Sequence, residues 1–107
     1  MQIEIYEKEV TPNVFKNVIK TVNALGNEFD WLDIESYPNP NLTFSIDFEQ
    51  DDKLLCLEIG STGVGWFVEH GEHGTIFKDI LGIVTEESFN TFIKELKQDL
   101  KKYFKKN

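Results

Sequence analysis

The sequence contains no arginine and only one cysteine. The absence of arginine removes the planar, bidentate clamp that many sites use to hold phosphate or carboxylate groups. Cys56 has no second cysteine with which to form a disulfide or a cysteine-rich zinc site. Both absences reduce the range of catalytic and metal centres that the chain can form.

Long apolar segments are also missing. The chain has no run of about 18 apolar residues, the length of a membrane-spanning helix, and residues 1–6 lack the basic and apolar regions of a secretion signal. Gly60, Gly63 and Gly65 are not followed by the lysine of a phosphate-binding loop. We therefore expect a cytoplasmic protein that spans no membrane and binds no cofactor.

The residues that are present suit one folded domain. The chain has 107 residues, of which 40% are hydrophobic and nine are phenylalanine. A chain of this length buries roughly two thirds of its unfolded surface, which is enough for one core. We find no repeat, linker or low-complexity segment and predict a single domain over residues 1–107.

Acidic side chains dominate the middle of the chain. The formal net charge is −8, and residues 28–79 contain twelve acidic residues against two lysines, Lys53 and Lys78. Residues 94–107 contain six lysines and two acidic residues. Repulsion from phosphates would oppose nucleic-acid binding by the middle segment, so we expect no direct nucleic-acid partner.

Two segments have apolar residues at helical spacing. The first spans about residues 12–25, with Thr11 as N-cap, Pro12 in the first turn and Gly26 just past the end. Its apolar positions are Phe15, Val18, Ile19, Val22 and Leu25. The second begins after Thr85 and has apolar residues at 89, 92, 93, 96, 100, 103 and 104.

Alternating apolar and polar residues predict the strands. They lie at about residues 2–6, 29–36, 42–49, 54–59 and 64–70, with a further strand at 75–81. Turn-forming residues occupy 37–41, 50–53, 60–63 and 71–74. The order of elements predicts an α+β fold, in which two helices pack on one face of an antiparallel sheet of about five strands. The other face of the sheet is then free.

The free face is predicted to be acidic. If Leu42, Phe44 and the apolar residues that alternate with them point at the helices, the intervening carboxylates point the other way. The residues predicted to bind a partner are Asp47, Glu49, Asp51, Asp52, Glu58, Phe67, Glu69 and, if it is exposed, Trp31. Alternatively, these polar residues simply cover the solvated face of an antiparallel sheet. Interleaved Leu54, Cys56 and Phe67 favour an interface, because contiguous exposed apolar area often marks one.

Both histidines of the chain lie in the segment Glu-His-Gly-Glu-His-Gly at residues 69–74. His70 and His73 are candidate metal ligands, but the glycines favour a solvated hairpin tip and no metal site is predicted. Cys56 lies among leucines, where cysteine is more often an inert small apolar residue than a nucleophile. We therefore predict that the protein is not an enzyme.

The combination of features resembles a known group of proteins. A short acidic chain with a carboxylate-rich antiparallel sheet, and with the segment Leu57-Glu58-Ile59-Gly60-Ser61-Thr62-Gly63-Val64-Gly65-Trp66-Phe67, is similar to the cytoplasmic immunity proteins of bacterial polymorphic-toxin and contact-dependent growth-inhibition systems. The resemblance implies an inhibitor that binds a cognate toxin, often a basic nuclease. No functional residue is transferred, because these families share architecture and little sequence.

Two other functions remain as alternatives. The first is a phage or mobile-element protein that imitates the charge of DNA and inhibits a host defence enzyme. It requires carboxylates spaced like phosphates along an elongated surface. The second is a small metal-binding domain or enzyme centred on His70 and His73.

Overall fold

Both helices begin where the sequence predicts, and the first also ends where predicted. The computed structural model describes residues 1–106. Helix α1 (Pro12–Leu25) begins after Thr11, whose hydroxyl accepts a hydrogen bond from the Val14 amide, and ends at Gly26 in the left-handed region with φ 55°. Helix α2 (Glu86–Tyr103) begins after Thr85, which exchanges backbone-to-hydroxyl hydrogen bonds with Ser88.

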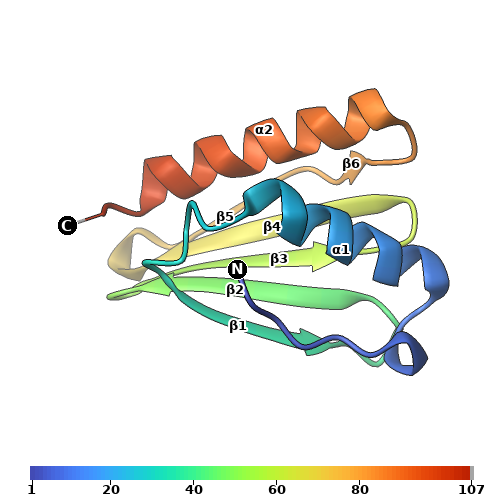
Figure 1. Ribbon diagram of the computed structural model, residues 1–107. Helices are drawn as coiled ribbons and strands as arrows, with labels where there is room; N and C mark the ends of the chain where they lie inside the picture. The colour runs from blue at the N-terminus through green and yellow to red at the C-terminus, as the bar shows by residue number, and fades with distance from the viewer. Residues whose placement is uncertain (107) are drawn as a thin grey trace.

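Six antiparallel strands form the sheet (Figure 1). The strands are β1 (Asp33–Pro38), β2 (Phe44–Gln50), β3 (Lys53–Ile59), β4 (Gly63–His70), β5 (Thr75–Phe77) and β6 (Leu81–Gly82). Neighbours follow the order β1-β2-β3-β4-β5, and β6 also pairs with β4. Short 3-10 turns occur at η1 (Glu7–Glu9) and η2 (Gly71–His73). Strands β5 and β6 therefore share one edge of the sheet.

Both helices lie over the same face of the sheet, as Figure 1 shows, and the core fills the space between them. The central strands contribute nine buried residues to the core: Phe44, Ile46, Phe48, Leu55, Leu57, Ile59, Val64, Trp66 and Val68. Trp66 packs against Phe92 of α2 and donates its indole N–H to Asp99 at 2.9 Å. The predicted α+β fold, with two helices on one face, is confirmed.

The face of α1 that enters the core differs from the predicted stripe. Val14, Asn17, Val18, Thr21 and Leu25 are buried, whereas Ile19 is exposed. Asn17 faces inward because its amide donates to the carbonyl oxygens of Gly60 and Ser61, at 2.9 and 3.1 Å. Two polar residues thus occupy core positions, and one of them fixes the β3–β4 turn beneath the helix.

Four predicted strand segments differ in the structure. Residues 2–6 are extended but form no ladder, and the amino group of Met1 instead binds the Gly26 carbonyl and the Asp30 carboxylate. Residues 29–32 form a turn, so β1 begins four residues later than predicted. Leu42 lies in the following turn with φ 69°, exposed and outside the core. The segment 75–81 is interrupted between β5 and β6.

Candidate functional site

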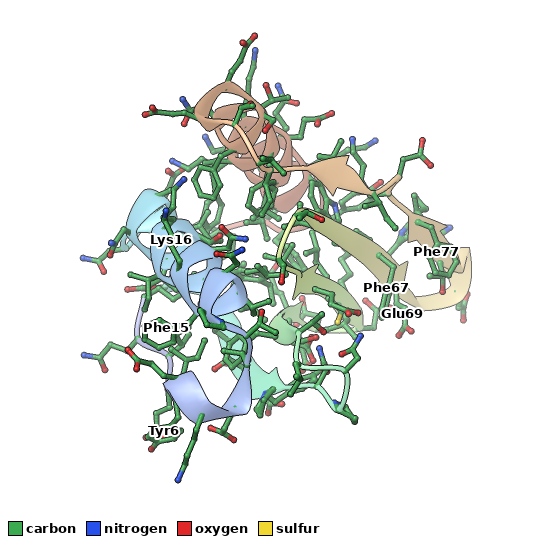
Figure 2. The ribbon with its side chains drawn as sticks, turned by 90° about the vertical axis from the view of Figure 1, so that its right-hand side faces the viewer. Tyr6, Phe15, Lys16, Phe67, Glu69 and Phe77 are labelled. Atoms are coloured by element: carbon green, nitrogen blue, oxygen red, sulfur yellow. The ribbon has the colours of Figure 1, made fainter. Side chains whose placement is uncertain are left out.

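The face of the sheet opposite the helices collects carboxylates from four adjacent strands. The register places in one row Asp33, Glu49, Leu54, Glu69 and Thr75, in the next Glu35, Asp47, Cys56, Phe67 and Phe77, and in the third Tyr37, Ser45, Glu58 and Gly65. We call these residues the open face. It contains six carboxylates and, within residues 1–106, no lysine in any of the three rows. Figure 2 shows Phe67, Glu69 and Phe77 on this side, away from Phe15 and Lys16 of α1.

Two pairs of like charges stand directly opposite each other on the open face. Asp33 is the cross-strand partner of Glu49, and Glu35 is the partner of Asp47. Directly opposed side chains have Cβ atoms about 5 Å apart, and like charges at that spacing destabilise a sheet. Repulsion between these opposed carboxylates therefore destabilises the sheet, and a lysine in place of one member of a pair would remove that repulsion.

Asp47 is buried and does not present its charge to solvent. It is only 9% exposed, and the hydroxyl of Tyr37 lies 3.3 and 3.2 Å from its two carboxylate oxygens. The same hydroxyl is 3.8 Å from the sulfur of Cys56, the cross-strand partner of Asp47. The predicted docking role of Asp47 therefore does not suit its position, because its carboxylate is covered by Tyr37 and accepts a hydrogen bond from the Tyr37 hydroxyl.

The thiol of Cys56 is held in its neutral form. Burial, followed by its hydrogen bond to Asp47 and the charge of that carboxylate, raises the pKa of Cys56 to about 12. His70 pairs with Lys53, three residues along β3 from Cys56, so the imidazole and the thiol are separated by about 10 Å of strand. The cysteine and this histidine do not form the contact that a nucleophile and its base require.

Three of the predicted carboxylates are exposed on the open face: Glu49, Glu58 and Glu69. Glu58 is oriented by the β1–β2 turn, because its carboxylate accepts hydrogen bonds from the Thr43 hydroxyl at 2.7 Å and from the Asn41 amide at 3.4 Å. A fixed carboxylate loses less conformational freedom when a cation binds it than a mobile one does.

Asp51 and Asp52 lie at the end of the sheet, in the β2–β3 turn. Asp51 has a left-handed backbone with φ 56°, and the Asp52 carboxylate packs against the backbone of Gly71, where a side chain would not fit. Both carboxylates are exposed, but they extend the acidic area beyond the rim of the open face. They lie beside the open face and not within it.

An apolar area adjoins the carboxylates at the β5 edge. The rings of Phe67 and Phe77 have centroids 6.0 Å apart, and Ile80 lies over Gly65, where an added Cβ would sit 3.6 Å from it. These residues border a hollow of about 440 Å³ whose rim includes Glu58. Phe67 matches its predicted position. Phe77 and Ile80 were not predicted as site residues, because the sequence does not show that β5 lies at the edge of the sheet.

Trp31 does not belong to the open face. It is half-buried in the turn before β1, where it packs against Phe29 with ring centroids 6.5 Å apart and donates its indole N–H to the Glu28 carbonyl at 3.0 Å. These contacts place it at the edge of the core, so its predicted role as an exposed interface residue does not suit its position. Trp66, at 4% exposure, is the more buried of the two tryptophans.

His70 and His73 stack on each other at the β4–β5 connection. Their ring centroids are 5.2 Å apart, and His70 also packs against Tyr103 of α2 at 5.5 Å. Within residues 1–106, no cluster of three or more histidine, cysteine, aspartate or glutamate side chains has the geometry to hold a metal ion. The two imidazoles make aromatic contacts at the end of the sheet.

A scan of family models, a search of curated proteins and a search of solved structures each found no match to this chain. Neither helix of the described part combines the length and the apolar character that crossing a membrane requires. The geometry of the open face therefore carries the functional argument.

Proposed function

We propose that this protein binds and neutralises a cognate basic protein toxin in the cytoplasm, through the open face of its sheet. The single observation that carries the proposal is that six carboxylates, five of them exposed, share this face with no lysine among residues 1–106, two pairs of them in direct cross-strand opposition. The resemblance to bacterial immunity proteins implies a cognate toxin, and the carboxylates of the open face support a basic partner.

The proposed mechanism is electrostatic occlusion. A toxin that cleaves nucleic acid has a positively charged groove that accommodates phosphates. The exposed carboxylates Glu49, Glu58 and Glu69 present the complementary charge on a rigid sheet. Such complementarity raises the association rate and selects a basic partner, while the aromatic pair Phe67 and Phe77 supplies apolar area to bury.

Charge distribution across the molecule supports one-sided docking. The two helices contain six lysines and four carboxylates, and Lys97 and Lys101 both lie 3.2 Å from Glu28, a residue outside the open face. A basic partner approaching the helices would meet charges of both signs, and one approaching the three rows of the open face would meet carboxylates. The field of the molecule therefore favours one orientation.

The test uses the protein encoded next to this chain, because an immunity protein is expected beside its toxin. We expect that neighbour to stop growth when expressed alone, and co-expression of this protein to restore growth. Charge reversal of Glu49, Glu58 and Glu69 to lysine should abolish the rescue, whereas reversal of Glu7, an exposed glutamate in η1, should not. A neighbour without toxicity, or full rescue by the triple variant, would reject the proposal. Binding of a DNA-dependent defence enzyme instead would support the DNA-imitating alternative.

A further inference from the structure

The outer edge of β5 has backbone groups available for another strand. The Lys78 amide donates to the Trp66 carbonyl at 2.9 Å, and the His70 amide donates to the Gly74 carbonyl at 3.1 Å. These two bonds show that the backbone groups of Gly74 and Lys78 point toward β4. The direction of the N–H and C=O groups alternates from residue to residue along an antiparallel strand, so those of Thr75 and Phe77 point away from β4. No strand pairs with them among residues 1–106.

The opposite edge of the sheet is different. The extended N-terminal segment runs past β1 (Figure 1), and residues 2–4 line the same hollow as residues 35–37 of β1. Ile3 and Ile5 pack against the core, and the amino group of Met1 is fixed by Gly26 and Asp30. The N-terminal segment therefore flanks the β1 edge, whereas no strand among residues 1–106 pairs with the outer edge of β5.

Apolar side chains surround the open β5 edge. Phe77 is 76% exposed, Ile80 81% and Ile76 45%. An isolated edge strand normally carries charged residues or proline that discourage pairing with other chains. Here three large apolar side chains are exposed instead, over five residues of sequence.

The charges around this edge are negative. Glu69 is the cross-strand partner of Thr75, and Glu72 and Asp79 are exposed in the segments that flank β5. The one lysine of this segment, Lys78, turns to the helix side, where it lies 3.2 Å from Glu95 and over the Trp66 ring. Basic side chains on an added strand would therefore meet carboxylates, and Lys78, which also borders the hollow beside Phe77, is paired with Glu95.

We infer that the outer edge of β5 binds an extended segment of the basic partner as an added strand, in which a lysine or arginine lies opposite Thr75 and aliphatic residues lie opposite Ile76 and Phe77. For the identity of the partner, this inference rests on the proposed function. Residues of the added strand that lie opposite Thr75 and Phe77 have their side chains on the open face. A basic side chain opposite Thr75 reaches toward Glu69, and an aliphatic side chain opposite Phe77 packs beside the rings of Phe77 and Phe67. A second copy of the chain fits poorly, because pairing two edges would bring two molecules of net charge −8 together.

The experiment uses a capped synthetic octapeptide with Lys-Val-Val at its centre, so that a lysine can lie opposite Thr75 while valines lie opposite Ile76 and Phe77. Titrated into the full chain, it should slow hydrogen exchange of the Thr75 and Phe77 amides and shift their NMR signals. Thr75→Pro removes an outward N–H and leaves the β4–β5 bonds intact, and it should weaken binding roughly tenfold, while Thr75→Ala should bind as the parent does. Thermal melts establish that both variants are folded. A glutamate–valine peptide, and a lysine–valine peptide methylated on alternate amides, should not bind.

The outcomes separate this inference from the proposed function. If Glu69→Lys weakens peptide binding but Thr75→Pro and amide methylation do not, the acidic face binds cations and strand addition is wrong. If Thr75→Pro and methylation weaken binding but Glu69→Lys does not, strand addition stands and the electrostatic basis of the proposed function fails. Protection of the two amides without peptide, together with a dimer in sedimentation, would show that a second copy occupies the edge and would overturn the inference.

Discussion

Reversing one charge on the open face should make the protein more stable. Glu49 lies opposite Asp33, and Glu49→Lys would replace a cross-strand repulsion by an attraction. Two unit charges about 5 Å apart in water interact by about 0.8 kcal/mol, which salt at 0.1 M reduces to about 0.5 kcal/mol. Glu49→Gln, which only removes the repulsion, should therefore add about 0.5 kcal/mol to the free energy of unfolding. Glu49→Lys should add about 1 kcal/mol.

Urea unfolding measures these differences. With a slope of about 2 kcal/mol per molar urea, the midpoint should rise by about 0.25 M for Glu49→Gln and about 0.5 M for Glu49→Lys. The matched control is Glu7→Lys, which makes the same charge change at an exposed position outside the open face. In 1 M salt the advantage of both Glu49 variants should shrink, because the Debye length falls to about 3 Å. An unchanged midpoint for Glu49→Lys, or an equal rise for Glu7→Lys, would refute the claim that repulsion between Asp33 and Glu49 destabilises the sheet.

Three further outcomes follow from the contacts around the open face and α2. Cys56, with its pKa raised to about 12, should be roughly one part in ten thousand thiolate at pH 8, so Ellman's reagent should react with it slowly until urea unfolds the chain. Tyr37→Phe removes the donor above Asp47 and should lower the free energy of unfolding by about 1 to 2 kcal/mol, as urea titration will show; an unchanged midpoint would mean that the contact is not made in solution. Hydrogen bonds from two lysines of α2 lower the pKa of Glu28, so its contribution to stability is present above the ordinary pKa of glutamate and is lost as the pH falls through the lowered value. Glu28→Gln should therefore reduce stability slightly at pH 7 and leave it unchanged near pH 2, and an equal effect at both values would contradict the assignment.

Strand alternation in the sequence was sufficient to predict which residues face the helices. In β2, β3 and β4 every second residue is large and apolar, and a shift of one residue would expose that whole set. The same reasoning failed for residues 2–6, because alternation reports burial and not hydrogen bonding. Ile3 and Ile5 satisfy the pattern by packing on the core without joining a ladder.

The site was less predictable because it depends on contacts between strands. Asp47 is covered by Tyr37 from the neighbouring strand, and that contact depends on a register set by the β1–β2 turn. Asn17 took a core position in α1 because its amide serves two turn carbonyls 43 and 44 residues away. The exposure of Phe77 depends on which strand is last in the sheet, and a single sequence does not show this order.

The remaining choice is between a docking surface and an ordinary solvated face. On a face whose only task is solvation, opposite charges across strands would add stability, and selection for folding alone would favour them. The chain has 11 lysines, yet none lies in the three rows of the open face within residues 1–106, and those of α2 include two that pair with Glu28. The arrangement gives up stability that was available and leaves the carboxylates of one face without a lysine among residues 1–106. Binding to a positively charged surface recovers that loss, since a cation placed between opposed carboxylates converts their repulsion into attraction.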